Sequence, residues 1–214
     1  MSDQKIVAAF NECLALQNTF NSVVNPEWRK AGYNWRRAMW IETAELIDHL
    51  GYKWWKNIDA QWDHKQALLE VVDIFHFLLS EAMLENKKGT DLFHAYKWAT
   101  HHYYAPTKEL KIKQCEEFVA ACLDGSSVIT TFFQVMLSLE VTVDELTKYY
   151  LGKNALNKFR QDKGYKQGTY QKQWMFNSEL VEDNKVLEHI LESSTVTGFD
   201  TIYNELKVLY PVQA

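Results

Sequence analysis

Apolar residues recur every three or four positions through most of this chain, which is the period of an amphipathic α-helix. Near the start, Ile6, Phe10, Leu14 and Phe20 fall on one helical face. Only three prolines and eight glycines interrupt 214 residues, and so few helix breakers favour long helices over strands joined by turns. The pattern predicts an all-α protein with helices at about 3–23, 35–50, 60–86, 107–123, 126–139, 142–162 and 197–209.

Residues that start or stop helices mark several of these boundaries. Gly51 follows the second predicted helix as a C′ glycine, and Gly125 lies just beyond the fourth. Thr142 and Glu145 have the spacing of a capping box, in which each side chain accepts a hydrogen bond from the other residue's backbone N–H. Polarity rises between 177 and 197, and we assign no regular element there.

Composition is typical of a globular protein, with 47% apolar and 24% charged residues. The length suits one domain over 1–214 with a sizeable core. A net charge of −5 argues against a protein that binds the phosphate backbone of nucleic acids. The three cysteines form no CxxC, so we expect buried thiols in a reducing compartment. With no secretory pattern and no membrane-spanning apolar run, we expect a cytoplasmic protein.

Two pairs of acids interrupt otherwise apolar helices: Glu42 with Glu45, and Glu70 with Asp73. A spacing of three places both members of a pair on one helix face. Burying carboxylates is costly, and four of them on facing helices would raise one another's pKa unless cations compensated them. Divalent ions with oxygen ligands, Mg²⁺ above all, would do so. The pairs therefore predict a metal site, although acids at this spacing more often form solvated helix faces.

Other residues are suited to a nucleotide. Gln17 and Asn21 lie one turn apart near the end of the first helix. His76 lies one turn beyond Asp73 and could border the metal site. Trp54 belongs to the stretch YKWWK, where rings and ammonium groups could meet a base and its phosphates. The alternatives are a solvated last turn for the amides, a satisfied core residue for the histidine and core packing for the tryptophan.

The segment 150–174 is basic in an otherwise acidic protein, and Gly164 and Gly168 bracket a part of it that could hold phosphate. A solvated helix end is the alternative. The chain contains no GxxxxGK[ST], which argues against a P-loop enzyme. Metal ions facing phosphates, with amides and an aromatic ring for a base, favour hydrolysis or transfer at a nucleoside phosphate.

The acid pattern E-x-x-E and then E-x-x-D on consecutive helices resembles that of the all-α nucleoside triphosphate pyrophosphatases. ETAELIDHLGYKWWK, LLEVVDIFHFLLS and GKNALNKFRQDKGY…EDN are more closely similar to segments of the dimeric dUTPases. The likeness extends from Gln17 to Asn184. It implies a homodimeric helical bundle, two or three Mg²⁺ per site (replaceable by Mn²⁺), and hydrolysis of dUTP, and of dUDP, to dUMP, which controls the dUTP pool. Residues 91–125 match no family segment and are interpreted as a variable insertion.

The resemblance also implies a role for each candidate residue. Glu42 is the general base that orients the attacking water, and Asn184 closes the site. Asn18 competes with Gln17 for its place. The metal ligands are Glu42, Glu45, Glu70 and Asp73; the deoxyuridine contacts are Gln17, Asn21, Trp54, His76, Asn157 and Tyr165; the phosphate contacts are Lys153 and Arg160.

Three alternatives remain open. The same fold could act on dCTP or on a broader set of nucleotides, because uracil and cytosine differ at N3 and at the 4-position, where one amide turned the other way would change the preference. A helical di-iron protein would need Glu-x-x-His pairs, which the acid pairs do not match. A non-catalytic helical interaction protein would leave the acids solvated.

Overall fold

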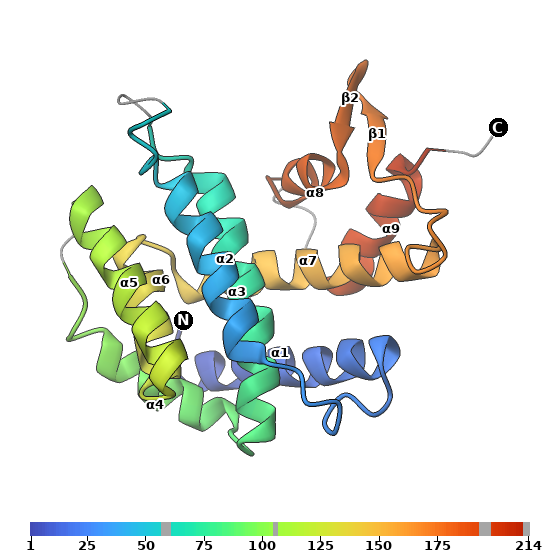
Figure 1. Cartoon of the computed structure of the whole chain (residues 1–214). Helices are drawn as coiled ribbons and strands as arrows, with labels where there is room; N and C mark the ends of the chain where they lie inside the picture. Colours follow the sequence, from blue (N-terminus) through green and yellow to red (C-terminus); the bar gives the residue numbers. More distant parts are fainter. Residues whose placement is uncertain (57–60, 105–106, 193–197, 212–214) are drawn as a thin grey trace. The chain divides into compact units, whose positions relative to one another are not determined.

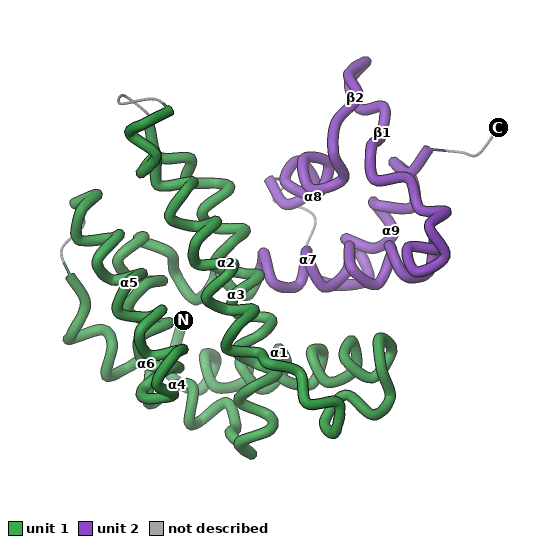
Figure 2. Tube along the Cα trace, in the orientation of Figure 1, with its two compact units in different colours: residues 1–147 green, residues 148–214 purple. Residues whose placement is uncertain are grey.

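The computed structural model describes residues 1–56, 61–104, 107–192 and 198–211, which form nine helices and one two-stranded hairpin (Figure 1). The chain divides into two compact units, Met1–Thr147 and Lys148–Ala214 (Figure 2). Each unit is described by itself, and the single catalytic domain over 1–214 stays a prediction. The mostly helical architecture confirms the predicted all-α class.

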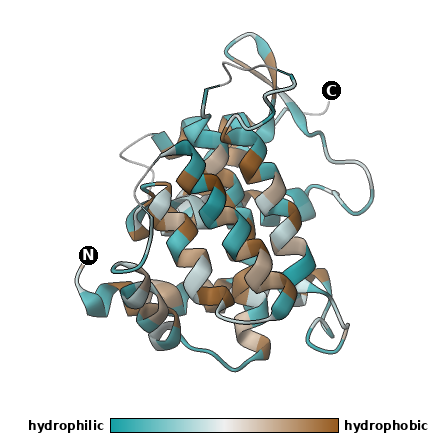
Figure 3. Cartoon of the chain, turned by 60° about the vertical axis from the view of Figure 1, so that its left-hand side comes forward, coloured by the Kyte–Doolittle hydropathy of each residue, from teal (hydrophilic) through white to brown (hydrophobic). Residues whose placement is uncertain are grey.

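The first unit is entirely helical in its described part. α3 contacts α1, α2 and α6, while α4 packs on α1 and α6, and α5 packs on α2 and α6. Along the helices, hydrophobic and hydrophilic residues alternate as amphipathic packing requires (Figure 3). Its elements are α1 (Asp3–Val24), α2 (Trp35–His49), α3 (His64–Leu84), α4 (Gly89–Ala99), α5 (Lys108–Asp124), α6 (Val128–Ser138) and the start of α7 (Val143–Asp162).

α2 and α3 lie side by side in opposite directions and position the predicted metal site (Figure 1). Where the chain returns, Asp63 N donates a hydrogen bond to His49 O at 2.9 Å. α3 is buried on most of its surface, because it lies between several neighbours. Its partly exposed positions from 66 to 82 recur every three or four residues and form one stripe: Gln66, Glu70, Asp73, Phe77 and Glu81.

The second unit combines the rest of α7 with a hairpin and two helices. β1 (Gln173–Phe176) pairs antiparallel with β2 (Glu179–Glu182), followed by α8 (Asp183–Glu192) and α9 (Phe199–Leu209). Trp174 is fully buried in the core of this unit, and its indole N–H donates to Gln171 O at 2.8 Å. The apolar partners in this core include Phe159, Leu187, Leu191, Ile202 and Leu206.

The helix boundaries confirm most of the predicted signals. Gly51 and Gly125 have φ of 71° and 81°, the left-handed conformation that helix ends favour in glycine. The capping box is present, because Glu145 N donates to Thr142 Oγ1 at 3.2 Å and Thr142 N donates to Glu145 Oε2 at 2.9 Å. All three cysteines are buried, as expected.

The hairpin and α8 form where we assigned no regular element, and α4 also lies outside the predicted helices. Asn177 and Ser178 form the two-residue turn of the hairpin, with φ of 50° and 68°. This turn prefers Asn-Gly, so Asn-Ser is a weak signal for it, and strands of four residues carry little periodicity. Among the described residues, no helix is both long enough and apolar enough to cross a membrane.

Candidate metal and nucleotide site

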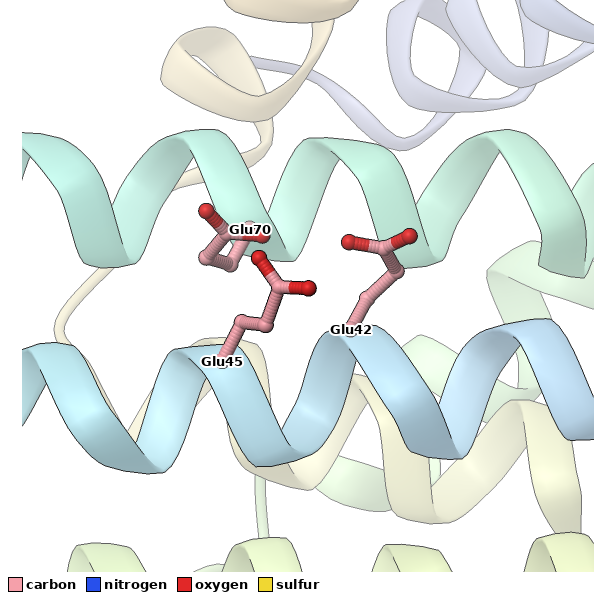
Figure 4. A group of neighbouring side chains, drawn as sticks. All are labelled: Glu42, Glu45 and Glu70. Atoms are coloured by element: carbon pink, nitrogen blue, oxygen red, sulfur yellow. The ribbon is translucent and has the colours of Figure 1, made fainter.

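Three of the four predicted metal ligands meet between α2 and α3. Glu42, Glu45 and Glu70 each bring a carboxylate oxygen within 4.8 Å of the other two (Figure 4). Glu45 is exposed, and the other two are partly buried. We call these three residues the acidic cluster. Oxygen donors at this separation suit a hard divalent cation, which would relieve the repulsion among the three charges.

The local sequence explains why these side chains converge. Thr43 and Leu46 face the core of the unit, so Glu42 and Glu45 lie on the neighbouring face of α2 beside the polar stripe of α3. Glu70 belongs to that stripe. Asp73 follows it by one turn on the same stripe but is not part of the acidic cluster, so its role as a ligand stays a prediction.

One basic group, His49, lies beside the acidic cluster, and two others near it in sequence pair with different acids. His49 Nε2 lies 3.6 Å from Glu70 Oε1, close enough to form an ion pair when the imidazole is protonated. Arg36 pairs with Glu81 further along α3. Lys53, in the aromatic stretch, pairs with Asp48 rather than with the acidic cluster.

The first-helix amides are buried beside the candidate histidine rather than solvated. Gln17 and Asn21 are 2% and 5% exposed. Gln17 Nε2 donates to Asn21 Oδ1 at 2.9 Å, and Gln17 Oε1 lies 2.7 Å from His76 Nδ1. Ser80 completes this group, since its Oγ accepts from Gln17 Nε2 at 3.2 Å and from Asn21 Nδ2 at 2.9 Å. We call these four residues the amide–histidine network.

Sequence reasoning missed Ser80, although it lies one turn after His76 in an apolar helix and is fully buried. A polar residue at that spacing is the signal that could have found it. The structure also separates the two competing amides. Asn18 is not in the network, and its Oδ1 accepts a hydrogen bond from Arg29 Nη2 at 3.0 Å.

The tryptophans of the YKWWK stretch are exposed rather than packed in a core. Trp54 is 65% exposed and Trp55 57%. Their rings meet edge to face with centroids 5.6 Å apart, and Tyr52 packs in the same way on Trp55. An exposed ring in the connection between the two acid-bearing helices is available to a ligand.

The second unit gathers three predicted substrate residues around one carboxylate. Arg160 donates to both oxygens of Asp183, from Nε and from Nη2, each at 2.8 Å. Arg160 also donates to Asn157 Oδ1 at 3.3 Å and to Asn184 Oδ1 at 3.5 Å. Tyr170 OH donates to Asp183 Oδ2 at 2.7 Å. We call Asp183, Arg160 and Tyr170 the Asp183 group.

The carboxylate of Asp183 is shielded from water, while Arg160 and Tyr170 are partly buried. Asp183 is fully buried as the first residue of α8, where the helix dipole favours a carboxylate. Burial, together with the hydrogen bond to Asp183, raises the pKa of Tyr170 well above its ordinary value. Sequence reasoning found Arg160 but missed Asp183 and Tyr170, because charge spacing along the chain does not reveal a partner 23 residues away.

The remaining predicted residues of this unit differ in exposure. Lys153, Asn157 and Arg160 recur at helical spacing on α7 and share a face. Lys153 is buried, whereas Tyr165 is half exposed in the loop that follows α7. The centroid of the Tyr165 ring lies 6.0 Å from that of Tyr170.

Comparison with protein families assigns most of the chain to a known family. A protein-family model described as dUTPase matches residues 9–165, which is most of the chain and includes both acid pairs, the amide–histidine network and α7. No curated protein matches the chain. Asp183 and Asn184 lie beyond the matched residues.

Proposed function

The chain belongs to the all-α dUTPase family, so it is a nucleotide pyrophosphatase that hydrolyses dUTP and dUDP, and we propose how its residues divide that work. The family uses a divalent metal. The observation that carries the proposal is the acidic cluster, because three carboxylates within 4.8 Å of one another suit such an ion. Glu42, Glu45, Glu70 and Asp73 hold Mg²⁺ in this proposal, two or three ions per site, with Mn²⁺ as a substitute.

Bound metal supplies two effects, neutralising phosphate charge and lowering the pKa of water. Glu42 serves as the general base. Its carboxylate orients the attacking water and accepts its proton, while the water oxygen bonds to phosphorus in the bridge between the α- and β-phosphates and the bond from that phosphorus to the bridging oxygen breaks. The products from dUTP are dUMP and pyrophosphate. Partial burial of Glu42 keeps the carboxylate in one orientation beside Glu45 and Glu70.

Gln17, Asn21, Trp54 and His76 form the deoxyuridine pocket in this proposal. Support comes from the burial and mutual hydrogen bonds of the amides and the histidine, which hold polar groups in fixed directions. Trp54 offers an exposed ring to the nucleoside.

For the second unit, the proposal assigns substrate contacts to Lys153, Asn157, Arg160, Tyr165 and Asn184. Lys153 and Arg160 meet the phosphates, Asn157 and Tyr165 contact the nucleoside, and Asn184 closes the site. Arg160 forms two hydrogen bonds of 2.8 Å with the carboxylate of Asp183, and these offset the positive charge of the guanidinium.

The active assembly is a homodimer in this proposal, as expected for this type of dUTPase. Light scattering of the purified protein measures its mass directly. A mass near twice 25.1 kDa is expected, and a mass near 25.1 kDa would contradict the dimer.

Product release from a nucleotide panel tests the function. Purified protein is incubated with Mg²⁺ and each deoxynucleoside triphosphate, and pyrophosphate is measured. Rapid Mg²⁺-dependent release from dUTP is expected, as is phosphate release from dUDP. Comparable release from dCTP would keep the metal site and reassign the base pocket. No release from any nucleotide would contradict the proposed mechanism.

A further inference from the structure

Ser80 lies at the junction of the amide–histidine network. The side chain is fully buried on α3, and its Oγ has three hydrogen-bonding neighbours among the described residues. Ser80 Oγ donates to the backbone oxygen of His76 at 3.0 Å. The other two neighbours are the side-chain amides of Gln17, at 3.2 Å, and Asn21, at 2.9 Å.

The single hydroxyl hydrogen of Ser80 determines how both amides are turned. A serine can donate one hydrogen bond, and the backbone oxygen of His76 can only accept. The hydrogen therefore points to His76 O, and the lone pairs of Ser80 Oγ face Gln17 and Asn21. An amide turned the other way would set its oxygen against those lone pairs. Both amides thus direct their NH₂ groups to Ser80.

This orientation reaches His76 through Gln17. Gln17 Nε2 donates hydrogen bonds to Ser80 Oγ and to Asn21 Oδ1. Gln17 Oε1 is therefore the atom that faces His76 Nδ1, at 2.7 Å. An amide oxygen only accepts, and Nδ1 must carry the hydrogen of that bond. In a neutral imidazole the lone pair then lies on Nε2. One serine hydroxyl therefore selects the tautomer of the histidine.

We propose that Ser80 is a positioning residue that sets the base preference, by fixing the donor and acceptor polarity of Gln17, Asn21 and His76. This inference rests on the proposed placement of the base against these residues. With Ser80 in place, His76 Nε2 is an acceptor and Asn21 Nδ2 is a donor. Uracil is their complement, since it has an N3–H donor beside carbonyl acceptors. Cytosine has a lone pair at N3 and an amino group at the 4-position, so it would meet acceptor with acceptor and donor with donor.

Ser80→Ala removes the hydroxyl with little change in volume, and Ser138→Ala is its matched control. Ser138 is also a fully buried serine of the first unit, but its Oγ donates to Val135 O of its own helix at 2.8 Å. The ratio of kcat/KM for dUTP to that for dCTP is measured for each protein. We expect about a tenfold fall of this ratio in Ser80→Ala, mainly through KM for dUTP, and no change in Ser138→Ala.

The tautomer of His76 can be measured directly, without an activity assay. Protein labelled with ¹⁵N-histidine is examined by NMR without nucleotide, with His76 assigned by its loss in His76→Gln. In wild type we expect hydrogen on Nδ1 and a lone pair on Nε2, and in Ser80→Ala a mixture of both tautomers. Hydrogen on Nε2 in wild type would overturn the proposal, even if Ser80→Ala does not fold.

The kinetic assays distinguish a failure of the proposed role of Ser80 from a failure of the proposed base pocket. A wild-type enzyme that hydrolyses dUTP and dCTP equally would overturn the base pocket and the role of Ser80 together. A dUTP-selective enzyme whose ratio is the same in Ser80→Ala and Ser138→Ala would overturn the role of Ser80 alone.

Discussion

The acidic cluster and the Asp183 group both contain carboxylates, but in different electrostatic environments. In the first unit, Glu42, Glu45 and Glu70 bring three like charges within 4.8 Å of one another. In the second unit, Asp183 is fully buried, and Arg160 neutralises it through two hydrogen bonds of 2.8 Å. Tyr170 adds a third bond to that carboxylate.

The difference separates a site from a structural anchor. A buried carboxylate whose charge is matched by the chain itself contributes to the folded state, and removal of either partner leaves an uncompensated charge. Carboxylates that lie close enough to repel one another are stabilised further when a cation binds between them. A protonated His49 beside Glu70 would offer part of this stabilisation, and divalent cations would offer more. Substitutions should therefore act on activity in one region and on stability in the other.

The largest effect is expected from Glu42→Gln. Loss of the general base should lower kcat by at least about 100-fold while dUTP still binds, because the amide keeps the size of the side chain. Single-turnover kinetics and equilibrium binding measure the two quantities. Glu116→Gln, an exposed glutamate on α5, makes the same charge change and should leave kcat intact. Normal turnover in Glu42→Gln would remove it from the mechanism.

Asp183→Asn should reduce the free energy of unfolding by about 3–5 kcal/mol, because it leaves the largely buried guanidinium of Arg160 uncompensated. Urea unfolding of the full chain measures this change. Asp162→Asn is the control in the same unit. It breaks a more exposed ion pair with Lys158, and exposed pairs contribute less than about 1 kcal/mol. Equal effects of the two variants would contradict the anchoring role of Asp183.

Asn157→Ala tests whether the Asp183 group is connected to the substrate. Arg160 donates to Asn157 Oδ1 at 3.3 Å and so directs the Asn157 NH₂ group away from the guanidinium. Loss of one hydrogen bond to the nucleoside should raise KM for dUTP about tenfold with little change in kcat. Steady-state kinetics measures both constants, and an unchanged KM would remove Asn157 from the pocket.

The smallest effect should have the opposite sign to that of Asp183→Asn. In metal-free buffer Glu45→Gln should raise Tm by about 1–3 °C, because it relieves repulsion in the acidic cluster. Asp73→Asn should shift Tm in the same direction by less, since Asp73 lies outside the acidic cluster, and it should also weaken the Mg²⁺ dependence of turnover. Thermal unfolding with and without Mg²⁺ measures these shifts. A Tm well below that of wild type would contradict either prediction.

Periodicity and spacing predicted the features that depend on local sequence. The period of apolar residues located most helices, and the i, i+3 spacing of acids placed Glu42 with Glu45, and Glu70 with Asp73, on single helix faces. Capping at Thr142 was readable for the same reason, because both partners lie within one turn of helix.

Features that depend on tertiary contacts were not predicted from the sequence. The hydroxyl of Ser80 gains its importance only when α1 packs against α3 and brings the amide of Gln17 within 3.2 Å. Asp183 reaches Arg160 only because the hairpin reverses the direction of the chain. The two residues of the hairpin turn, Asn177 and Ser178, are an uncommon pair for such a turn. Asp183 and Arg160 share no motif along the chain, and the one-turn spacing of Ser80 from His76 does not by itself reveal the contact with Gln17.

Mg²⁺ binding to the acidic cluster is the most direct test of this account. Isothermal titration in the presence of the non-hydrolysable analogue α,β-imido-dUTP compares wild type, Glu70→Gln and the surface control Glu116→Gln. The account predicts saturable binding to wild type and Glu116→Gln, and at least about tenfold weaker binding to Glu70→Gln, because a neutral amide is a poorer ligand than a carboxylate. Equal affinity in all three proteins would contradict the assignment of the acidic cluster as the metal site.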